Sequence, residues 1–225
     1  MKNKVLVLTE DGSCTFFLPE INEHYHSIHG AISESKHVFI EAGLNHKIKD
    51  NNSLNILEVG LGTGLNAALT LFEAESKKIK INYYAVEPYP LSAEDIKQLN
   101  YSDVSDSNRM KEVIHAIHTS LGENEVHISP YFVFNYLEKR IQEIDFENNH
   151  FNIVYFDAFS PDIQPDMWTA EVFQQIFNSM KPGGILVTYV AKGQVRRIMK
   201  SCGFIVEKLA GFANKREMTR AIKPE

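Results

Sequence analysis

Three glycines at alternate positions follow a short apolar segment that ends in an acid, in the sequence Leu57 to Gly64 (LEVGLGTG). The apolar segment predicts a strand, and the residues from Asn66 onward predict a helix. Glycine tolerates a positive φ and has no Cβ, so the backbone of this turn can approach a ligand closely. A GxGxG spacing led by an acid suits a positively charged nucleoside cofactor better than a pyrophosphate. We therefore expect S-adenosylmethionine to bind here, held by Glu58, Gly60, Gly62 and Gly64.

Glu87 ends the next strand-like segment along the chain. In nucleoside-binding α/β folds, an acid at this place accepts hydrogen bonds from the ribose hydroxyls, and we predict that role for Glu87. A nicotinamide cofactor would need such an acid too, but it is usually bound by GxGxxG rather than GxGxG. Asn66 stands three residues after Thr63, so its side chain is expected either to cap the helix or to contact the cofactor.

Asp157 follows the buried-strand pattern of residues 153–156 and precedes Ala158, Phe159, Ser160 and Pro161. A carboxylate beside aromatic side chains at the end of a buried strand is costly unless it has a partner. A substrate amine or ammonium would be such a partner, and the alternative is a structural acid that caps the following loop. Phe159 and Trp168 could flank a flat heterocycle, or they could pack the loop down.

Strand-like segments at 55–59, 82–86, 131–134, 153–156 and 185–190 alternate with helix-like segments at 66–75, 93–99, 109–120, 137–144 and 169–180. This alternation predicts an α/β fold, a Rossmann-like doubly wound parallel sheet covered on both faces. Strands at 204–209 and 217–222 are expected as an antiparallel pair at the edge of this domain, residues 51–225. Residues 1–50 are expected to form an N-terminal extension, with a hairpin (strands 4–8 and 15–18) and a helix at 34–42 closed by Gly43.

The composition of this 225-residue chain is that of an ordinary globular protein, with 44% hydrophobic and 23% charged residues. No apolar segment approaches the roughly 20 residues that span a bilayer, and no signal peptide is evident. Two cysteines cannot make a metal site, and no second cluster of acids or cysteines accompanies the histidines His24, His26 and His29. We therefore expect a cytoplasmic protein without a membrane or a metal.

The net charge is −6, but residues 181–225 hold ten of the 23 Lys and Arg and only three of the 29 Asp and Glu. This segment is expected to be either a solvated basic face or a local patch for a polyanion.

The chain resembles the methyltransferase module of the bacterial enzymes that methylate 5-aminomethyl-2-thiouridine at the wobble position of tRNA (MnmC-type, or MnmD when the module stands alone). The DAFSP sequence at Asp157 to Pro161, followed by PDMW, and the KREM sequence at 215–218 are specific to this resemblance, whereas many methyltransferases share the glycine loop. The other matching segments, in order between Tyr25 and Thr219, are Tyr25-His26-Ser27, Gly30-Ala31, Glu34-Ser35, Glu87 to Leu91, Pro182-Gly183-Gly184, Val195-Arg196-Arg197 and Gly203-Phe204.

The resemblance implies the class I fold of S-adenosylmethionine-dependent methyltransferases and transfer of a methyl group to the amine of 5-aminomethyl-(2-thio)uridine. It implies that Asp157 holds the amine and accepts a proton and that Phe159 stacks on the base. Tyr25, Ser27 and Glu34 are implied as lid or cofactor contacts, and Asn135 stands where an acid of the family contacts adenine. The residues expected to meet the tRNA are Pro161, Trp168, Lys192, Arg196, Arg197, Lys215 and Arg216.

In better-known members a flavin-dependent oxidoreductase is fused to this module. This chain ends at Glu225 without a second glycine-rich dinucleotide motif, so we expect methyl transfer only, coupled to a separate enzyme that makes the aminomethyl precursor. Three alternatives remain open. The first is a methyltransferase or aminopropyltransferase that acts on a small amine. The second is a tRNA-binding module without chemistry, and the third is a nicotinamide-dependent oxidoreductase.

Overall fold

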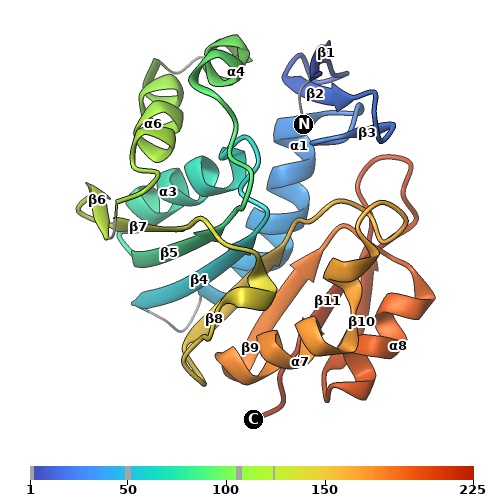
Figure 1. The fold of residues 1–225 in the computed structure, drawn as a ribbon. Coiled ribbons are helices and arrows are strands. Elements are labelled where there is room, and N and C mark those ends of the chain that lie inside the picture. Colours follow the sequence, from blue (N-terminus) through green and yellow to red (C-terminus); the bar gives the residue numbers. More distant parts are fainter. Residues whose placement is uncertain (1–2, 49–51, 105–107, 124) are drawn as a thin grey trace.

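The computed structural model describes residues 3–48, 52–104, 108–123 and 125–225. These residues form an eight-stranded sheet with the order β10-β11-β9-β8-β4-β5-β7-β6 (Figure 1). Its parallel strands are β4 (Ser53–Val59), β5 (Lys80–Val86), β7 (Phe132–Leu137), β8 (Phe151–Phe156) and β9 (Met180–Thr188). The chain order reverses at β4, which lies between β5 and β8, and ligands bind at such a switch point.

Both edges of the sheet are antiparallel. The predicted pair β10 (Ile205–Ala210) and β11 (Glu217–Ile222) is confirmed, and β11 pairs with β9. At the other edge, β6 (Val126–Ser129) pairs with β7, which the sequence pattern did not indicate. The structure therefore has the predicted Rossmann-like architecture with one additional edge strand.

Alternate residues of each strand face opposite sides of the sheet, and each side has its own apolar core. On β4, Leu54 and Ile56 belong to the core beneath α1 (Ala31–Ser35), η1 (Lys36–Leu44), α3 (Leu65–Lys77) and α6 (Asn108–Thr119). Leu57 and Val59 belong to the opposite core, beneath α7 (Ala170–Ser179) and α8 (Gly193–Ser201). At the carboxyl ends of the strands, the same alternation determines which side chains lie on the side of the sheet that α1 and α3 cover.

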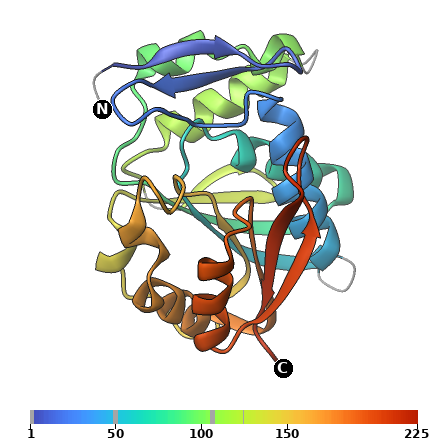
Figure 2. The ribbon, with the colours of Figure 1, turned by 90° about the vertical axis from the view of Figure 1, so that its right-hand side faces the viewer.

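The N-terminal residues form a separate three-stranded antiparallel sheet of β1 (Val5–Leu8), β2 (Cys14–Leu18) and β3 (Glu23–His24). It lies across one end of the molecule, beyond the carboxyl ends of the large sheet's strands (Figure 2). The β1–β2 hairpin confirms the prediction for this region, and β3 adds a third strand. The division at residue 50 stays a prediction, because the helical segment from Ala31 packs in the same core as the large sheet.

This helical segment runs through α1 and η1 into α2 (Asn45–Lys47), so the prediction that Gly43 ends it is wrong. A Cβ at Gly43 would lie 3.1 Å from side-chain atoms of both Tyr155 and Val187. Glycine is therefore needed here for close packing against β8 and β9, and not for a turn.

The helix expected at 137–144 is also wrong. Strand β7 continues its alternation of buried and half-buried residues to Leu137, and only η3 (Ile141–Glu143) is helical in this segment. Other helices in the described part of the chain are α4 (Ala93–Gln98), α5 (Tyr101–Val104) and η4 (Pro165–Trp168). Helix α4 begins with a capping box in which Ser92 and Asp95 exchange side-chain-to-backbone hydrogen bonds.

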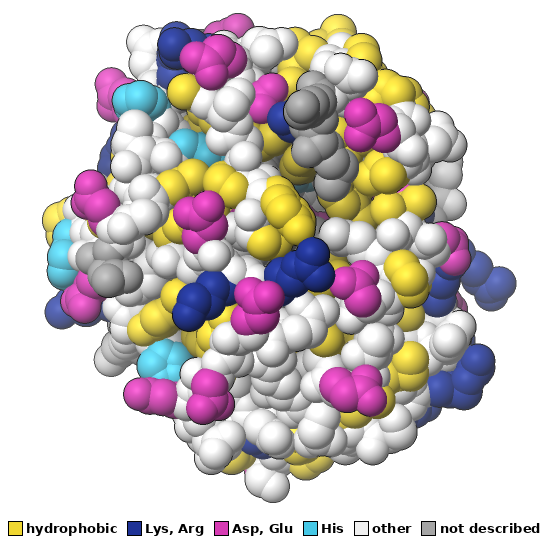
Figure 3. All heavy atoms as spheres, viewed as in Figure 1, with side chains coloured by type: hydrophobic (Ala, Val, Ile, Leu, Met, Phe, Trp, Pro, Cys, Tyr) yellow, Lys and Arg dark blue, Asp and Glu magenta, His cyan; other side chains and the backbone are white. Residues whose placement is uncertain are grey.

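Acidic and basic side chains are interspersed over the face shown in Figure 3, and basic side chains gather at its right-hand edge, over α8. The exposed cations of this segment include Lys192, Arg197 and Lys200. Among the described residues, no helix is long and apolar enough to span a membrane.

Candidate active site

A cavity of about 430 Å³ opens at the carboxyl ends of β4, β5 and β8, a volume within the usual range for a small-molecule site. One wall comes from the N-terminal sheet and the residues that follow it, and the others come from loops after the strands of the large sheet. The lining residues are 23–29, Glu34, Val59 to Gly62, Val86 to Tyr89, Arg140 to Gln142, Asp157 to Phe159, Gln164, Asp166, Met167, Tyr189 and Lys215.

The glycine loop lines this cavity with Gly60, Leu61 and Gly62. Gly60, Gly62 and Gly64 have φ values of 92°, 50° and 76°, a region that residues with a Cβ rarely adopt. A Cβ at Gly60 would lie 2.7 Å from the carbonyl oxygen of Asp157, and one at Gly62 would lie 3.1 Å from the Tyr25 ring. Gly60 and Gly62 line the cavity, whereas Gly64 is the N-cap of α3.

Thr63 fixes the loop to the segment after β3 and to α6 through two histidines. Its hydroxyl lies 2.8 Å from Nε2 of His26, and its carbonyl oxygen lies 3.0 Å from Nε2 of His118. Burial lowers the pKa of His26 to about 4 and also lowers the pKa of His118, so both rings are neutral at pH 7. The backbone of the loop is therefore held in place before a ligand arrives.

Two acids face the same side of the sheet at adjacent strand ends. Glu58 continues the series Leu54 and Ile56 on β4, and Asp157 continues the series Ile153 and Tyr155 on β8, so both point toward α3. Nδ2 of Asn66 donates to Oε1 of Glu58 and to Oδ2 of Asp157, both at 2.9 Å. Burial raises the pKa of Glu58 well above its usual range, and the pKa of Asp157 to about 7.

Charged side chains from two other elements surround Asp157. Glu34 of α1 adds to the rise in the pKa of Asp157, whereas Lys215 lowers it. Nζ of Lys215 donates to Oε1 of Glu34 at 3.1 Å and lies 4.4 Å from the centre of the Tyr189 ring. Oε2 of Glu34 accepts from the backbone N–H of Ser27, so the predicted contacts Ser27 and Glu34 are bonded to each other at the cavity wall.

Glu87 stands at the end of β5, on the same face as Tyr83 and Ala85. Its carboxylate accepts from the backbone N–H groups of Tyr89 (2.9 Å) and Gly62 (3.4 Å), and burial raises its pKa. These bonds hold the Glu87 carboxylate between the glycine loop and the residues that follow β5. The predicted hydrogen bonds to ribose hydroxyls would require an acceptor at this place.

The aromatic side chains Tyr25 and Phe159 meet edge to face across the cavity, with ring centres 5.4 Å apart. The backbone N–H of Phe159 donates to Oε1 of Gln164, and its carbonyl oxygen accepts from Nε1 of Trp168. The ring of Phe159 is thus presented to the cavity from a loop that is fixed on both sides.

The family of S-adenosyl-L-methionine-dependent methyltransferases matches residues 92–224 of this chain. The chain belongs to this family. Its cofactor is therefore S-adenosylmethionine, and the alternative of a nicotinamide-dependent oxidoreductase is overturned.

Bifunctional proteins named for tRNA 5-methylaminomethyl-2-thiouridine biosynthesis, MnmC, are similar to this methyltransferase. The protein from Pseudomonas fluorescens is 29% identical over 206 residues, and the one from Actinobacillus pleuropneumoniae (serotype 5b) is 29% identical over 223 residues. These alignments cover 87% and 92% of this chain but 31% and 33% of the relatives, so the chain spans about a third of their length. The resemblance to the MnmC methyltransferase module is thereby confirmed.

The crystal structure of MNMC2 from Aquifex aeolicus superposes with a TM-score of 0.83 at 26% identity, covering 99% of this chain and 71% of that chain. The carbon methyltransferase CurJ has a TM-score of 0.50 at 12% identity, covering 89% and 57%, which bears on the fold alone. Together with the sheet order, these similarities show the class I methyltransferase fold.

The residues of the methyltransferase cavity fit S-adenosylmethionine. Gly60 and Gly62 leave the space that a Cβ would fill, so a ligand can lie against the loop backbone. Five acidic residues line the cavity: Glu23, Glu34, Glu87, Asp157 and Asp166. Such a set suits a sulfonium cation and ribose hydroxyls, whereas it would repel a pyrophosphate.

The structure corrects the expectations for two amides. Asn66 does not cap its helix, because Gly64 is the N-cap and the Asn66 side chain bonds Glu58 and Asp157 instead. Asn135 does not follow a strand: it lies inside β7, its Nδ2 donates to the carbonyl oxygen of Tyr83 at 3.5 Å, and it is not among the cavity-lining residues. The strand is longer than expected because its alternation of buried residues continues past Phe134.

Trp168 and Pro161 do not reach the cavity. Trp168 is 3% exposed and packs edge to face against Phe156, and its Nε1–H donates to the carbonyl oxygen of Phe159. Of the two roles considered for Trp168, the structure therefore supports packing the loop down, and substrate contact by Trp168 is wrong.

Arg196 is also misassigned as an RNA contact. It is 7% exposed, and its guanidinium donates to the Thr219 hydroxyl, the Glu217 carboxylate and the carbonyl oxygen of Met218. The other four predicted cations, Lys192, Arg197, Lys215 and Arg216, are exposed. Lys192 pairs with Asp162, and of these four only Lys215 lines the cavity.

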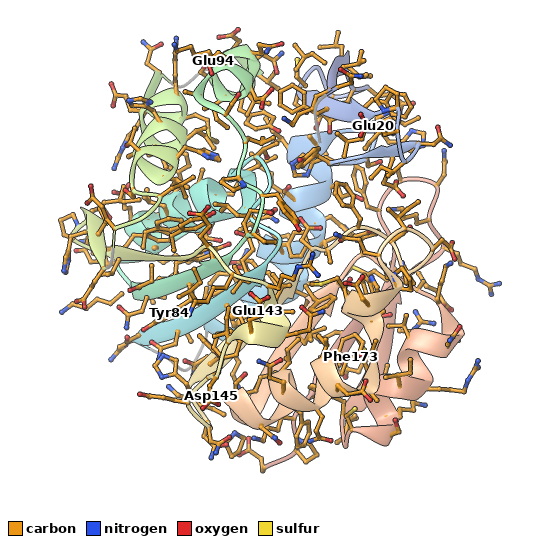
Figure 4. All side chains as sticks on the ribbon, in the orientation of Figure 1. Glu20, Tyr84, Glu94, Glu143, Asp145 and Phe173 are labelled. Carbon is orange, nitrogen blue, oxygen red and sulfur yellow. The ribbon has the colours of Figure 1, made fainter. Side chains whose placement is uncertain are left out.

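Sequence reasoning missed several lining residues. Tyr189 continues the series Ile185 and Val187 beyond β9, and strand periodicity could have indicated it. Arg140, whose guanidinium donates to the Tyr89 hydroxyl at 3.0 Å, gave no signal. Ile141 and Gln142 reach the cavity from η3, whose Glu143 is labelled in Figure 4.

Proposed function

We propose that this methyltransferase transfers a methyl group from S-adenosylmethionine to the primary amine of 5-aminomethyl-(2-thio)uridine in tRNA, giving 5-methylaminomethyl-(2-thio)uridine. The substrate is inferred from the MnmC relatives, and the acidic end of the cavity supplies the chemistry that an amine requires. The proposal includes a separate enzyme as the source of the aminomethyl precursor, and it places the protein in the cytoplasm.

When bound, the cofactor supplies a methyl group that is activated by a sulfonium. Gly60, Gly62 and Glu87 would hold it along the glycine loop, with Tyr25 closing the cavity above Gly62. The buried Glu58, which does not line the cavity, would support the loop from beneath rather than contact the cofactor directly.

Asp157 is the observation that carries this proposal. A primary amine in water is protonated at pH 7, with a pKa near 10.4 for the comparable lysine side chain, and only the neutral form has a lone pair for attack. Oδ2 of Asp157 accepts from Asn66, which leaves Oδ1 to accept an N–H of the substrate. With a pKa of about 7, the Asp157 carboxylate can orient the amine and take up its proton near neutral pH.

Lys215 and Phe159 complete the substrate side. The Lys215 ammonium, which lines the cavity near Asp157, disfavours a second ammonium beside it and so favours the neutral amine. Phe159 would stack on the uracil ring once the nucleotide is turned out of the anticodon stack. The exposed cations Lys192, Arg197 and Arg216 would meet phosphates of the RNA.

The test is methylation of tRNA purified from cells that accumulate the aminomethyl nucleoside, with the purified protein and S-adenosylmethionine, read by nucleoside mass spectrometry. We expect conversion of the aminomethyl nucleoside to its methylaminomethyl form. Free polyamines and the isolated nucleoside serve as competing substrates. Turnover of these small amines, with none of the tRNA, would favour a small-molecule amine methyltransferase or aminopropyltransferase instead. Binding of RNA without methylation under any condition would favour a binding module.

A further inference from the structure

One side chain joins the two acids at the switch point of the sheet. Asn66, the second residue of α3, is 2% exposed, and its Nδ2 lies 2.9 Å from a carboxylate oxygen of Glu58 and 2.9 Å from one of Asp157. Glu58 is the penultimate residue of β4, and Asp157 follows the neighbouring parallel strand β8. A single NH₂ group therefore spans two strand ends, with one hydrogen for each carboxylate.

The chemistry of the three groups fixes the orientation of this amide. If Asn66 were flipped, its carbonyl oxygen would face the charged carboxylate oxygen of Asp157 with no hydrogen between them, so only the NH₂ group can face both acids. Glu58 is 0% exposed and cannot move toward solvent. The Asn66 amide is therefore anchored at Glu58 and presents its second hydrogen at a fixed position to Oδ2 of Asp157.

Two carboxylates that share one amide repel each other when both are charged, so ionisation of one disfavours ionisation of the other. Glu58 is enclosed by Asn66, by the Tyr83 hydroxyl and by the charge of Asp157, and its pKa is raised well above its usual range. Asp157 has in addition the Lys215 ammonium nearby, which opposes the effects of burial and of Glu34. These surroundings therefore favour a charged Asp157 beside a neutral Glu58.

We propose that Asn66 is a positioning residue for the methyl-transfer reaction. In this arrangement it directs Oδ1 of Asp157 toward the amine, and the neutral carboxyl of Glu58 serves as its fixed anchor. Asn66 touches neither the substrate nor the reacting atoms. The inference deepens the proposed function, on which its activity measurements rest.

The test compares Asn66→Ala with Thr70→Val, a matched control one turn further along α3. Thr70 is equally buried and polar, but its hydroxyl bonds Tyr155 and not Asp157. We expect Asn66→Ala to lower kcat about 100-fold, the size of effect that follows misplacement of a catalytic group, with little change in cofactor affinity. Because Asn66 also lowers the pKa of Asp157, the acid limb of the pH–rate profile should move to higher pH in this variant only.

The role of Glu58 is tested by Glu58→Gln and Glu58→Ala. Glutamine keeps an oxygen that accepts from Asn66 and has the neutral charge assigned to Glu58, so kcat and the pH profile should be retained. Alanine removes the anchor and should reproduce the effect of Asn66→Ala. Loss of activity in Glu58→Gln equal to that in Glu58→Ala would show that a charged Glu58 is needed and would overturn the anchor role.

A measurement without turnover separates this inference from the proposed function. Carbon-13 NMR of protein labelled at the aspartate carboxyls, with Asp157→Asn for assignment, gives the pKa of Asp157 directly. We expect a higher pKa in Asn66→Ala than in the unchanged protein or in Thr70→Val. An unchanged pKa would overturn the positioning role even if tRNA is methylated, whereas a shifted pKa without methylation of tRNA would overturn only the proposed substrate.

One further outcome would contradict the positioning role. Oδ1 of Asn66 has no hydrogen-bond partner among the described residues. If Asn66 is a cofactor ligand instead, this oxygen would make the contact. A loss of cofactor affinity in Asn66→Ala, measured by calorimetry and as large as the loss in kcat, would establish that role instead. If Asn66→Ala does not fold, Asn66→Ser replaces it, because one hydroxyl hydrogen cannot bridge two carboxylates.

Discussion

At the carboxyl ends of β4 and β8, the acids Glu58 and Asp157 share an amide, and no cation of the described residues bonds either one. In the C-terminal segment, by contrast, cations are bonded to acids: Arg196 to Glu217 and Arg220 to Glu207. The pKa of each acid at the strand ends is raised, whereas the bond from Arg196 lowers the pKa of Glu217.

The difference separates charges that serve the fold from charges that are available for chemistry. An acid bonded to a buried arginine stays ionised and has little capacity to accept a proton near pH 7. An acid without a cation, buried at a strand end, lowers the stability of the fold and gains a pKa near neutrality. Such costs are typical of sites that bind or react, and the cavity is lined by Asp157 and not by Arg196.

Removing the Asp157 carboxylate is the sharpest test of this comparison. Asp157→Ala should reduce the methylation rate about 100- to 10,000-fold, because it removes the group that orients the amine and accepts its proton. Cofactor affinity, followed by calorimetry, should change little.

Asp162→Ala is the matched control for Asp157→Ala. This acid lies in the same loop but is exposed and paired with Lys192, so its loss should leave the methylation rate close to that of the unchanged protein. An equal loss of cofactor affinity and of rate in Asp157→Ala would make Asp157 a cofactor ligand and would contradict its role as a base.

The strand-end acids could be predicted from the sequence, and the cations could not. Glu58 is the penultimate residue of an apolar strand, and Glu87 and Asp157 each follow one. The alternation of the strands and the common edge of a parallel sheet therefore determine where the three acids lie. The long side chain of Arg196 belongs to a helix and can point to solvent or fold back. Its three partners all belong to β11, which is distant in the sequence, and no local pattern indicates such a contact.

The fold shows the same limit. The parallel strands were predictable because their apolar segments are strong, and their boundaries failed where two patterns competed. Residues 137–144 have a helix-like composition, which predicts a helix that starts at Leu137. Pairing with β5 buries alternate side chains of β7, and it extends this strand through Leu137 instead. A glycine at position 43 predicts the end of a helix. Only the structure shows that Gly43 lies inside the helical segment, where it allows close packing against Tyr155.

A second prediction concerns how the buried carboxylate of Asp157 lowers the stability of the folded protein. Its pKa rises from an ordinary value of 3.8 to about 7 in the folded protein, so between these pH values the folded state keeps a proton that the unfolded state has lost. This difference lowers stability progressively as the pH rises through the window, and the full cost is present above about pH 7.

Asp157→Asn removes this titration while keeping the shape of the side chain. The free energy of unfolding of the variant, minus that of the unchanged protein, should increase from pH 4 to pH 7 and then stay constant, reaching a few kcal/mol. Urea denaturation at a series of pH values gives this difference. A difference that is independent of pH would mean that Asp157 is ionised with its ordinary pKa, and the contrast with the paired acids would fail.

The smallest effects come from the neighbours Arg196 and Arg197, which the structure assigns to different tasks on one helix. Arg196→Ala leaves the Thr219 hydroxyl and the carbonyl oxygen of Met218 without their buried donor, so it should lower stability by about 1–3 kcal/mol. The exposed Arg197 has no such internal contact among the described residues, so Arg197→Ala should leave the denaturation midpoint unchanged. Its effect should be on tRNA affinity, with the slope of log K against log salt reduced by about one. Denaturation measurements should therefore show a loss of stability only in Arg196→Ala, and filter binding should show a smaller salt slope only in Arg197→Ala. The reason is that the charge of Arg196 supports the fold, whereas that of Arg197 is free to bind phosphate. A reduced salt slope in folded Arg196→Ala, with none in Arg197→Ala, would reverse this assignment.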